Sequence, residues 1–460
     1  PILEMQSAAS PSIVMFWCLT QGAITVLQEF ATQKQQDLFI PKLRTGEWGG
    51  TMGLTEPGAG SEVGACKSRA IPTDVPGKYK LTGTKCFISS GDHDLTENII
   101  HLMLAKTPGA KEGTAGISLF IVPKFWVNDD GSLGAWNDVT TMGIEHKLGI
   151  HGSTTATLSM GENDNCYGWM VGEAEVKDGR GVGMKQMFAY MNEERLNTGL
   201  FSLGCMGSAY YAALEYAKIR VQSKHSTNPK GPSVRIIEHE DVRRMLMFQK
   251  SMIEACRALI YKSYLYRDLA VDAATPEERD YYDDMFAINN PLCKAYTSDM
   301  ARLTTGDAIQ CHGGYGFTEE YAPAELYRDV VIYGIWEGTN FIQAQDYTGR
   351  KFTMKDSVPF TKWVAEIDAF VVGKKTDEFA AEFAMMADAM VAFKDIVAAV
   401  YGKKSSQGHR LLKKLSQSPM SRNLTTASLS KPASDIFHSV KPALLRPCSG
   451  MHFFAFLTFF

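Results

Sequence analysis

The sequence lacks any closely spaced pair of cysteines. Its nine cysteines are scattered over 460 residues, and none of them forms a C-x-x-C pair. We therefore expect neither a zinc site nor a disulfide framework, and a reducing compartment is favoured. No apolar run reaches the roughly 18 residues that a membrane span requires. The formal net charge is only -4, which gives no reason to expect a nucleic-acid partner.

Helical and strand-like patterns follow one another in three blocks. Residues 1–48 have apolar side chains at helical spacing, which Pro41 is expected to disturb. Residues 49–165 consist of short apolar or alternating runs separated by Gly, Asp, Asn and Pro, a pattern that predicts an antiparallel β domain. Residues 184–355 have apolar side chains three and four apart over long stretches, which predicts a helix bundle. The predicted fold class is therefore α+β.

The two ends of the chain depart from this pattern. The chain begins at Pro1 inside an apolar segment, so we expect the N-terminal helical domain to be cut short. Residues 356–402 are rich in Phe, Ala and Met and predict the start of an extra helical domain. Residues 403–460 carry nine Lys or Arg and one acidic residue. This basic tail is expected to be disordered or foreign to the fold, and a nucleic-acid or membrane arm is the alternative.

A glycine-rich segment, residues 163–183, joins the predicted β domain to the helices. Its Gly179-x-Gly181-x-Gly183 run differs in spacing from the G-x-G-x-x-G fingerprint of dinucleotide-binding folds, and no strand of a βαβ unit precedes it. We therefore predict a flexible connector rather than a nucleotide site.

Two segments of the predicted β domain suit a flat or anionic ligand. The first, Gly53–Glu62, has glycines that let the backbone approach a ligand closely, and Thr55 and Ser61 add hydroxyl groups. In the second, Phe87 and Ser89 stand two apart on a predicted strand and therefore share one face. Such a pair can stack on a ring and bond to its edge, although an ordinary strand end is the plainer explanation of that segment alone.

Two further segments lie in the helical block. The third has the pattern Gln310-x-x-Gly313-Gly314-Tyr315-Gly316-Phe317, in which the glycines again allow close backbone approach. The fourth, Ile335–Asn340, contains Glu337 between a tryptophan and a glycine.

In this order and at these separations, the four segments resemble those of acyl-CoA dehydrogenases over residues 10–355. The similarity is greatest to the larger branch that includes 3-methylmercaptopropionyl-CoA dehydrogenase and carries an extra C-terminal helical domain. The supporting segments are residues 87–94, 116–123, 145–153 and 343–351. The resemblance implies an N-terminal helical domain, a middle antiparallel β domain and a C-terminal four-helix bundle. It also implies a homodimer or homotetramer. The localisation stays open, because the bacterial cytoplasm and the mitochondrion fit equally.

The resemblance implies α,β-dehydrogenation of an acyl-CoA to a trans-2-enoyl-CoA, with electrons passed to an electron-transfer flavoprotein. Glu337 would take the α-proton as general base, and the β-hydrogen would leave as hydride to N5 of FAD. Contacts with FAD are implied for Thr55, Phe87, Ser89, Arg220, Gln222, Gln310, Gly313, Gly314, Thr339 and Asn340. Of these, Gln310 and the two glycines would serve the neighbouring subunit. Contacts with the CoA substrate are implied for Ser61 and Arg195, although Asn192 replaces the family's usual Asp.

A second glutamate competes with Glu337 for the role of base. Isovaleryl and long-chain members of the family carry their glutamate at the position of Glu194. Their residue at the Glu337 position is usually small, so the glutamate found there favours Glu337. Glu194 is then expected to be a surface acid or a helix N-terminal acid.

Two alternatives to this activity stay open from the sequence. One is an acyl-CoA oxidase that uses oxygen, and the other is an inactive fragment or binding protein on the same fold. The acyl chain cannot be read from the residues, and 3-methylthiopropionyl-CoA is one candidate.

Overall fold

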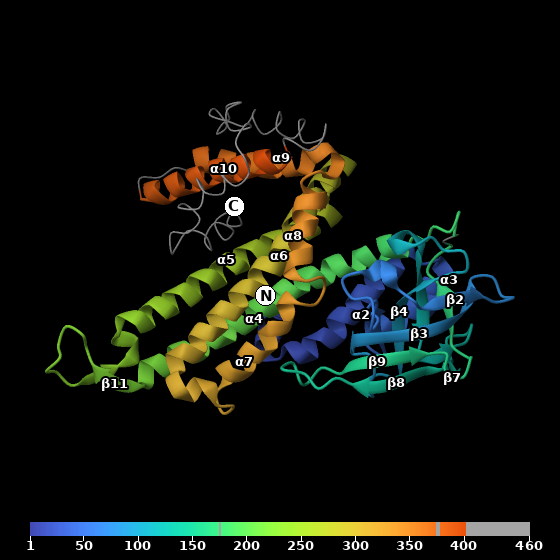
Figure 1. The fold of residues 1–460 in the computed structure, drawn as a ribbon, viewed down its shortest axis with the longest axis horizontal. Helices are drawn as coiled ribbons and strands as arrows, with labels where there is room; N and C mark the ends of the chain where they lie inside the picture. The colour runs from blue at the N-terminus through green and yellow to red at the C-terminus, as the bar shows by residue number, and fades with distance from the viewer. Residues whose placement is uncertain (174–175, 374–377, 402–460) are drawn as a thin grey trace. The chain divides into compact units, whose positions relative to one another are not determined.

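The computed structural model describes residues 1–173, 176–373 and 378–401. The chain divides into two compact units. Unit 1 consists of Pro1–Ser208 and Thr318–Gly338, and unit 2 consists of Ala209–Phe317 and the residues from Thr339 onward. Helices, then strands, then long helices follow one another along the chain (Figure 1), which confirms the predicted α+β class. The predicted basic tail, residues 403–460, lies outside the described residues.

Unit 1 begins with three helices, α1 (Ile2–Ala9), α2 (Pro11–Phe30) and α3 (Gln33–Thr45). A capping box between Thr32 and Gln35 opens α3, and Gly46 ends it in the left-handed conformation, at φ 77°. The expectation that Pro41 would disturb this helix is wrong, because α3 continues through it to Thr45. Two capped ends and a buried apolar face outweigh the single backbone hydrogen bond that a proline removes.

A mixed sheet follows these helices. Its strands are β1 (Trp48–Gly53), β2 (Arg69–Pro72), β3 (Lys78–Ser89), β4 (Asn98–Lys106), β5 (Ile117–Pro123), β8 (Val139–Ile144), β9 (Thr155–Met160) and β10 (Tyr167–Met170). The order is β1-β4-β5-β10-β3-β9-β8, with β2 against β3. Neighbours along this order are antiparallel except at the edge, where β1 runs parallel to β4. A separate hairpin pairs β6 (Phe125–Val127) with β7 (Leu133–Trp136).

The sequence predicted that the glycine-rich segment between the sheet and the next helix is a flexible connector, and this prediction is wrong. Residues Tyr167–Met170 form strand β10, which lies between β5 and β3. Gly181 packs on the chain beside β5, where an added Cβ would lie 2.3 Å from the carbonyl oxygen of Ile117. This close approach requires glycine, so the run serves packing rather than mobility.

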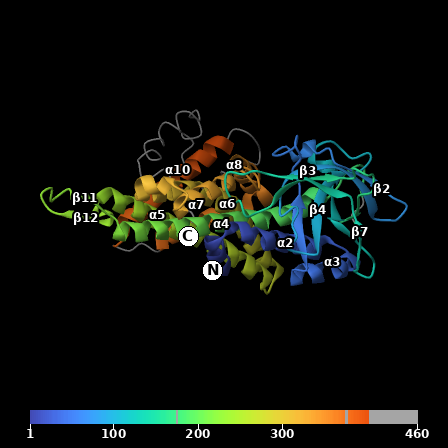
Figure 2. The ribbon, with the colours of Figure 1, turned by 90° about the horizontal axis from the view of Figure 1, so that it is seen from below.

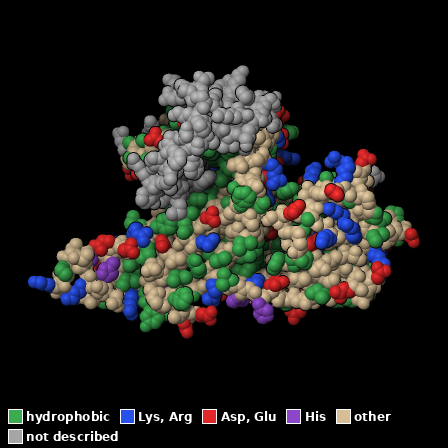
Figure 3. Space-filling view, viewed as in Figure 1, with side chains coloured by type: hydrophobic (Ala, Val, Ile, Leu, Met, Phe, Trp, Pro, Cys, Tyr) green, Lys and Arg blue, Asp and Glu red, His purple; other side chains and the backbone are tan. Residues whose placement is uncertain are grey.

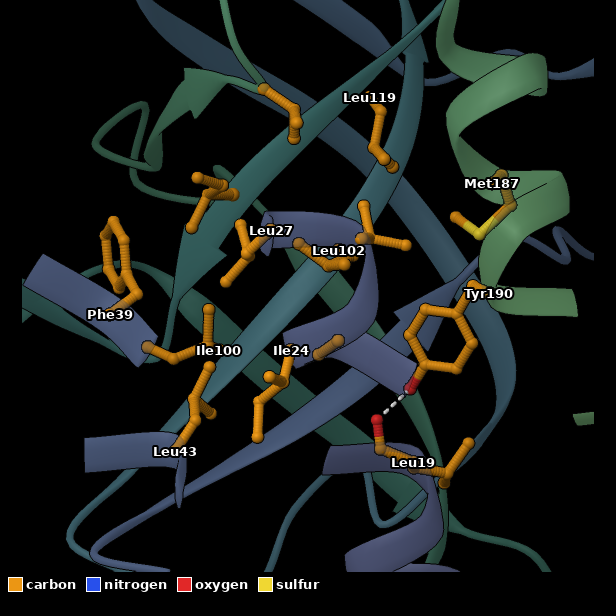
Figure 4. Close-up of a cluster of buried hydrophobic side chains, with 14 of the residues drawn as sticks. Leu19, Ile24, Leu27, Phe39, Leu43, Ile100, Leu102, Leu119, Met187 and Tyr190 are labelled. Atoms are coloured by element: carbon orange, nitrogen blue, oxygen red, sulfur yellow. Dashed lines mark hydrogen bonds between the residues drawn. The ribbon is translucent and has the colours of Figure 1, made fainter. Parts of the chain in front are cut away.

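The core of unit 1 joins the helices to one face of the sheet. Side chains from α2, α3, β1, β4, β5 and α4 (Gly183–Ile219) form one buried cluster (Figure 4). The Tyr190 hydroxyl donates to the carbonyl of Leu19, and Thr20 Oγ1 accepts from the amide of Gly50 at 3.0 Å. These bonds fix α2 to α4 and to β1 within an apolar core.

Helix α2 is the only helix of the described residues that is long and apolar enough to cross a membrane, and 56% of that stretch is buried inside the protein. A buried core helix passes the same test of length and composition. Two views show α2 and α3 lying beside β4 (Figures 1 and 2). On the face that Figure 3 shows, acidic and basic side chains are interspersed over the strands.

Unit 2 is helical. Helix α4 ends in it, at Ile219, and a hairpin of β11 (Val221–Lys224) and β12 (Ser233–Arg235) follows. Helices α5 (Glu240–Val271) and α6 (Pro276–His312) pack along each other, and the short α8 (Asn340–Asp346) packs on α6. Helix α7 (Ala322–Val330) belongs to unit 1.

The predicted helical stretch at residues 356–402 is present. It consists of α9 (Val358–Gly373) and α10 (Ala380–Tyr401). Phe360 and Phe393 pack in a T-shaped contact between the two helices, 6.0 Å between ring centroids. Lys394 Nζ lies 2.6 Å from Asp368 Oδ2, and both side chains are buried. The predicted limits of the domains, at residues 48, 165, 184 and 355, stay predictions.

Candidate active site

The loop after β1 exposes the backbone of the first predicted ligand segment. Reciprocal hydrogen bonds between the main chains of Glu56 and Ala59, at 3.0 and 3.2 Å, close a tight turn. A Cβ added at Gly58 or Gly60 would meet no described atom within 4 Å. Ser61 is exposed at the end of this turn. The loop therefore offers open backbone and a hydroxyl to a ligand.

The second segment lies at the end of β3. Phe87 is 64% exposed and has φ 59°, and the pairing of β3 with β9 shifts register between Lys85 and Ile88. This bulge interrupts the simple alternation from which we predicted a shared face for Phe87 and Ser89. A strained backbone that exposes a large aromatic ring is typical of a ligand site. The amide of Cys86 donates to the carbonyl of Thr55 at 2.9 Å, so the first two segments are neighbours.

Glu337 lies in the turn between α7 and α8. It has φ 52°, an unfavourable value for a side chain with a Cβ, and Gly338 after it has φ 81°. Arg195 Nε donates to the carbonyl oxygen of Glu337 at 3.3 Å, and the Arg195 side chain is buried. The structure thus joins two predicted site residues that are 142 positions apart. The expected contact of Arg195 with CoA stays a prediction.

In unit 2, the predicted residues of the third segment lie beside those of the β11 hairpin. The guanidinium of Arg220 is 5.8 Å from the ring centre of Tyr315, and its Nη2 donates to Gln222 Oε1 at 3.2 Å. Gly313 has φ 64°, and in the described part of the chain no atom lies within 4 Å of a Cβ placed there or at Gly314. Gln310 is exposed at the end of α6. An exposed cation beside open glycine backbone suits a phosphate group.

The fourth segment continues into α8. Thr339 is the N-cap of this helix, and its Oγ1 accepts from the amide of Ile342 at 3.3 Å. Asn340 is engaged by α6, because its Oδ1 accepts from buried Lys294 at 2.9 Å and its Nδ2 donates to Asp299 at 2.8 Å. The structure therefore gives Asn340 a role in docking α8, and its predicted contact with FAD is not tested.

Comparison with known proteins identifies the family. Residues 51–162 match the acyl-CoA dehydrogenase middle domain, and residues 181–350 match the acyl-CoA dehydrogenase C-terminal domain. A butyryl-CoA dehydrogenase of Syntrophomonas wolfei is 68% identical over 397 residues, which are 86% of this chain and 65% of that protein. The chain belongs to the acyl-CoA dehydrogenase family.

Two further relatives support this membership in the acyl-CoA dehydrogenase family. A 3-methylmercaptopropionyl-CoA dehydrogenase of Ruegeria pomeroyi is 38% identical over 371 residues, covering 81% of this chain and 61% of that protein. The solved structure of butyryl-CoA dehydrogenase from Megasphaera elsdenii has a TM-score of 0.61 and 28% identity, covering 75% of this chain and 79% of that one. This chain spans less than two thirds of the length of the Syntrophomonas and Ruegeria proteins.

The sequence suggested that Glu194 is a surface acid or a helix N-terminal acid, and both expectations are wrong. It is 4% exposed and lies well inside α4, which begins at Gly183. Burial, together with the nearby carboxylates of Glu337 and Glu193, raises the pKa of Glu194 well above its usual range. Burial and the two neighbouring acids therefore disfavour the charged form of Glu194.

Sequence reasoning missed a buried acid in the first segment, Glu56. Its side chain is 6% exposed and pairs with the fully buried Lys85 of β3, Nζ to Oε1 2.8 Å. Burial opposes the charged form, but Lys85 and hydrogen bonds from Cys66 and Ser68 lower the pKa of Glu56 to about 2. A Glu and a Lys in two neighbouring ligand segments were the signal in the sequence that could have predicted this pair.

Proposed function

We propose that this chain carries the reaction centre of an FAD-dependent acyl-CoA dehydrogenase, which converts an acyl-CoA thioester to a trans-2-enoyl-CoA. The observation that carries the proposal is the environment of Glu337. Its backbone stands in a left-handed turn bonded to Arg195, and burial raises the pKa of the second acid nearby, Glu194, well above its usual range. A positioned carboxylate of this kind is the part that α-proton abstraction needs.

The residues present fit a flavin. In unit 1 the exposed ring of Phe87 can stack on a flat ring system, and the segment of Thr55 is bonded to that of Phe87 and Ser89 through the amide of Cys86. In unit 2 Arg220 and the open backbone at Gly313 and Gly314 suit a diphosphate. We assign FAD contacts to Gln222, Gln310, Thr339 and Asn340 from the family resemblance alone.

The chain's own residues divide the chemistry as follows. Glu337 removes the α-proton of the thioester, and positioned base catalysis of this type is worth roughly 10²–10⁴ in rate. The amide N–H of Glu337 donates to the thioester carbonyl oxygen, where negative charge develops. Ser61 orients the CoA part of the substrate, and Arg195 orients Glu337 through the bond to its carbonyl oxygen. FAD, when bound, supplies the acceptor for the hydride that leaves the β-carbon.

For the acyl group we propose a short straight chain. The 68% identical relative is named a butyryl-CoA dehydrogenase, whereas the relative named for 3-methylmercaptopropionyl-CoA is 38% identical. Electron-transfer flavoprotein is the proposed acceptor, and a homodimer or homotetramer is the proposed assembly, with Gln310, Gly313 and Gly314 serving the FAD of the neighbouring subunit.

The test is anaerobic bleaching of flavin absorbance by a panel of acyl-CoAs that includes butyryl-CoA, 3-methylthiopropionyl-CoA and a long-chain acyl-CoA. We expect the most rapid bleaching with butyryl-CoA. Absence of bound FAD, or bleaching by none of the panel, would overturn the proposal. Turnover with ferricenium but not with oxygen would distinguish a dehydrogenase from an oxidase.

A further inference from the structure

An ion pair lies buried between the first two ligand segments of unit 1. Glu56 comes one residue after Thr55, and Lys85 comes two residues before Phe87. The two charges are 2.8 Å apart, and the Lys85 side chain is wholly buried. The pair therefore belongs to the same two segments as Thr55 and Phe87, which the proposed function places against FAD.

Directed hydrogen bonds surround this pair. Besides Lys85, the carboxylate of Glu56 accepts from Ser68 Oγ at 2.6 Å, Cys66 Sγ at 3.0 Å and the amide of Lys67 at 2.6 Å. Lys85 also donates to the carbonyl of Leu54 at 3.3 Å. The bonds thus reach both sides of Thr55 along the loop, and each fixes a direction as well as a distance.

Stability alone does not explain a buried ion pair. Taking two charges out of water costs several kcal/mol, and well-packed apolar residues of similar volume often stabilise a protein as much or more. Directional bonds between two segments contribute something that apolar packing does not, namely one fixed geometry. Here the fixed geometry is that of the loop at Thr55 relative to the bulge at Phe87.

We propose that Glu56 and Lys85 form a positioning pair, which holds the Thr55 loop and the Phe87 bulge in the geometry that binds the flavin ring. The proposal rests on the proposed function, because it takes these two segments as the flavin site. Neither residue is a catalytic residue, since both act through the segments that they hold.

The test compares two double variants of the full chain. Glu56→Gln with Lys85→Met removes both charges without leaving one unpaired. Asp368→Asn with Lys394→Met makes the same change at a second buried pair, between α9 and α10. For each protein we would measure the Kd of FAD for the apoprotein, the absorbance spectrum of the bound flavin, the thermal midpoint, and amide exchange at residues 53–61 and 86–89.

We expect the Glu56/Lys85 double variant to weaken FAD binding by at least about tenfold, the loss of one or two charge-assisted bonds. Its flavin spectrum should shift and amide exchange should rise in the two segments, while the Asp368/Lys394 double variant leaves all three unchanged. The thermal midpoints of the two variants should fall by similar amounts.

Unchanged amide exchange in the two segments would overturn the proposal. Faster exchange with FAD affinity and spectrum like those of the wild type would also overturn it, because the pair would then be structural only. A wild-type chain that binds no FAD would refute the proposed function and with it the positioning role, and the exchange data would still show whether the pair fixes the loop. The two failures are therefore distinguishable.

Discussion

Arg195 donates from Nε to the main-chain carbonyl of Glu337 at 3.3 Å, although the two residues are 142 positions apart in the chain. The bond links α4 to a turn in which Glu337 has φ 52°. A carbonyl held by a buried guanidinium fixes the peptide plane, and the peptide plane fixes the direction in which the glutamate side chain leaves the backbone. Arg195 thus orients the proposed base through its backbone.

Replacing Arg195 should therefore affect catalysis more than binding. We expect Arg195→Gln to lower kcat by roughly 10- to 100-fold, the value of one charge-assisted hydrogen bond, with a small change in KM. Arg195→Lys keeps the charge but not the Nε geometry, and should be impaired as well. Steady-state kinetics would show this, whereas a raised KM at normal kcat would mean that Arg195 contacts CoA instead.

Glu194 makes the stability of the protein depend on pH in a defined direction. Its pKa is raised in the folded state by burial and by Glu337 and Glu193. As pH rises, the unfolded chain therefore loses this proton before the folded protein does. The free energy of unfolding falls as pH rises above the ordinary glutamate pKa of 4.5, by at most about 1.4 kcal/mol per pH unit. Glu194→Gln should flatten this decline. Urea unfolding at about pH 5 and pH 8 would test it, and equal slopes in both proteins would refute the raised pKa.

His101 gives the opposite slope. It is fully buried in β4 with Nδ1 2.7 Å from Thr51 Oγ1, and burial lowers its pKa to about 3. The contribution of neutral His101 to the free energy of unfolding is fully present above pH 6.5, the ordinary pKa of histidine. This contribution is lost as pH falls towards 3, and about 2 kcal/mol of it is lost at pH 5. His101→Asn keeps a polar partner for Thr51 and should lose less stability between pH 7.5 and pH 5. A decline equal to that of the wild type would contradict this.

Phe87 should matter for the flavin and little for the fold. Its ring is 64% exposed, so Phe87→Ala removes little buried area. We expect an unchanged thermal midpoint and FAD binding weakened by about tenfold. This loss agrees with the roughly 0.5–1.5 kcal/mol that an aromatic pair contributes in addition to the apolar area that it buries. Leu95, which is 68% exposed in the same unit, provides the matched control. Equal FAD affinity of Phe87→Ala and Leu95→Ala would remove Phe87 from the site.

Local patterns were sufficient to predict the classes of the elements. Apolar spacing predicted the helices before Gly46 and after Gly183, and short runs between turn residues predicted the strands between them. Pro41 shows the limit of a local rule, because the tertiary packing of Phe39 and Leu43 keeps α3 intact around it. Strand β10 escaped prediction because its four residues pair with β5 and β3, which are distant in sequence.

The candidate site was predictable as a set of segments but not as a geometry. Resemblance named Glu337 and Arg195 without indicating that one bonds to the carbonyl of the other. The burial of Glu194 depends on how α4 packs, so its sequence position alone suggested an exposed acid. The pairing of Glu56 with Lys85 likewise depends on the contact between the loop and β3, which no periodicity encodes.

The central claim is that Glu337 removes the α-proton. The most direct measurement is the rate of anaerobic flavin bleaching by butyryl-CoA in Glu337→Gln, with Glu194→Gln as the matched control. Glu194 lies in α4 and is the acid whose pKa the charge of Glu337 raises. We predict that Glu337→Gln keeps its FAD and bleaches at least about 10²-fold more slowly, while Glu194→Gln retains most of its rate. Near-normal bleaching by Glu337→Gln, or the larger loss in Glu194→Gln, would contradict the assignment.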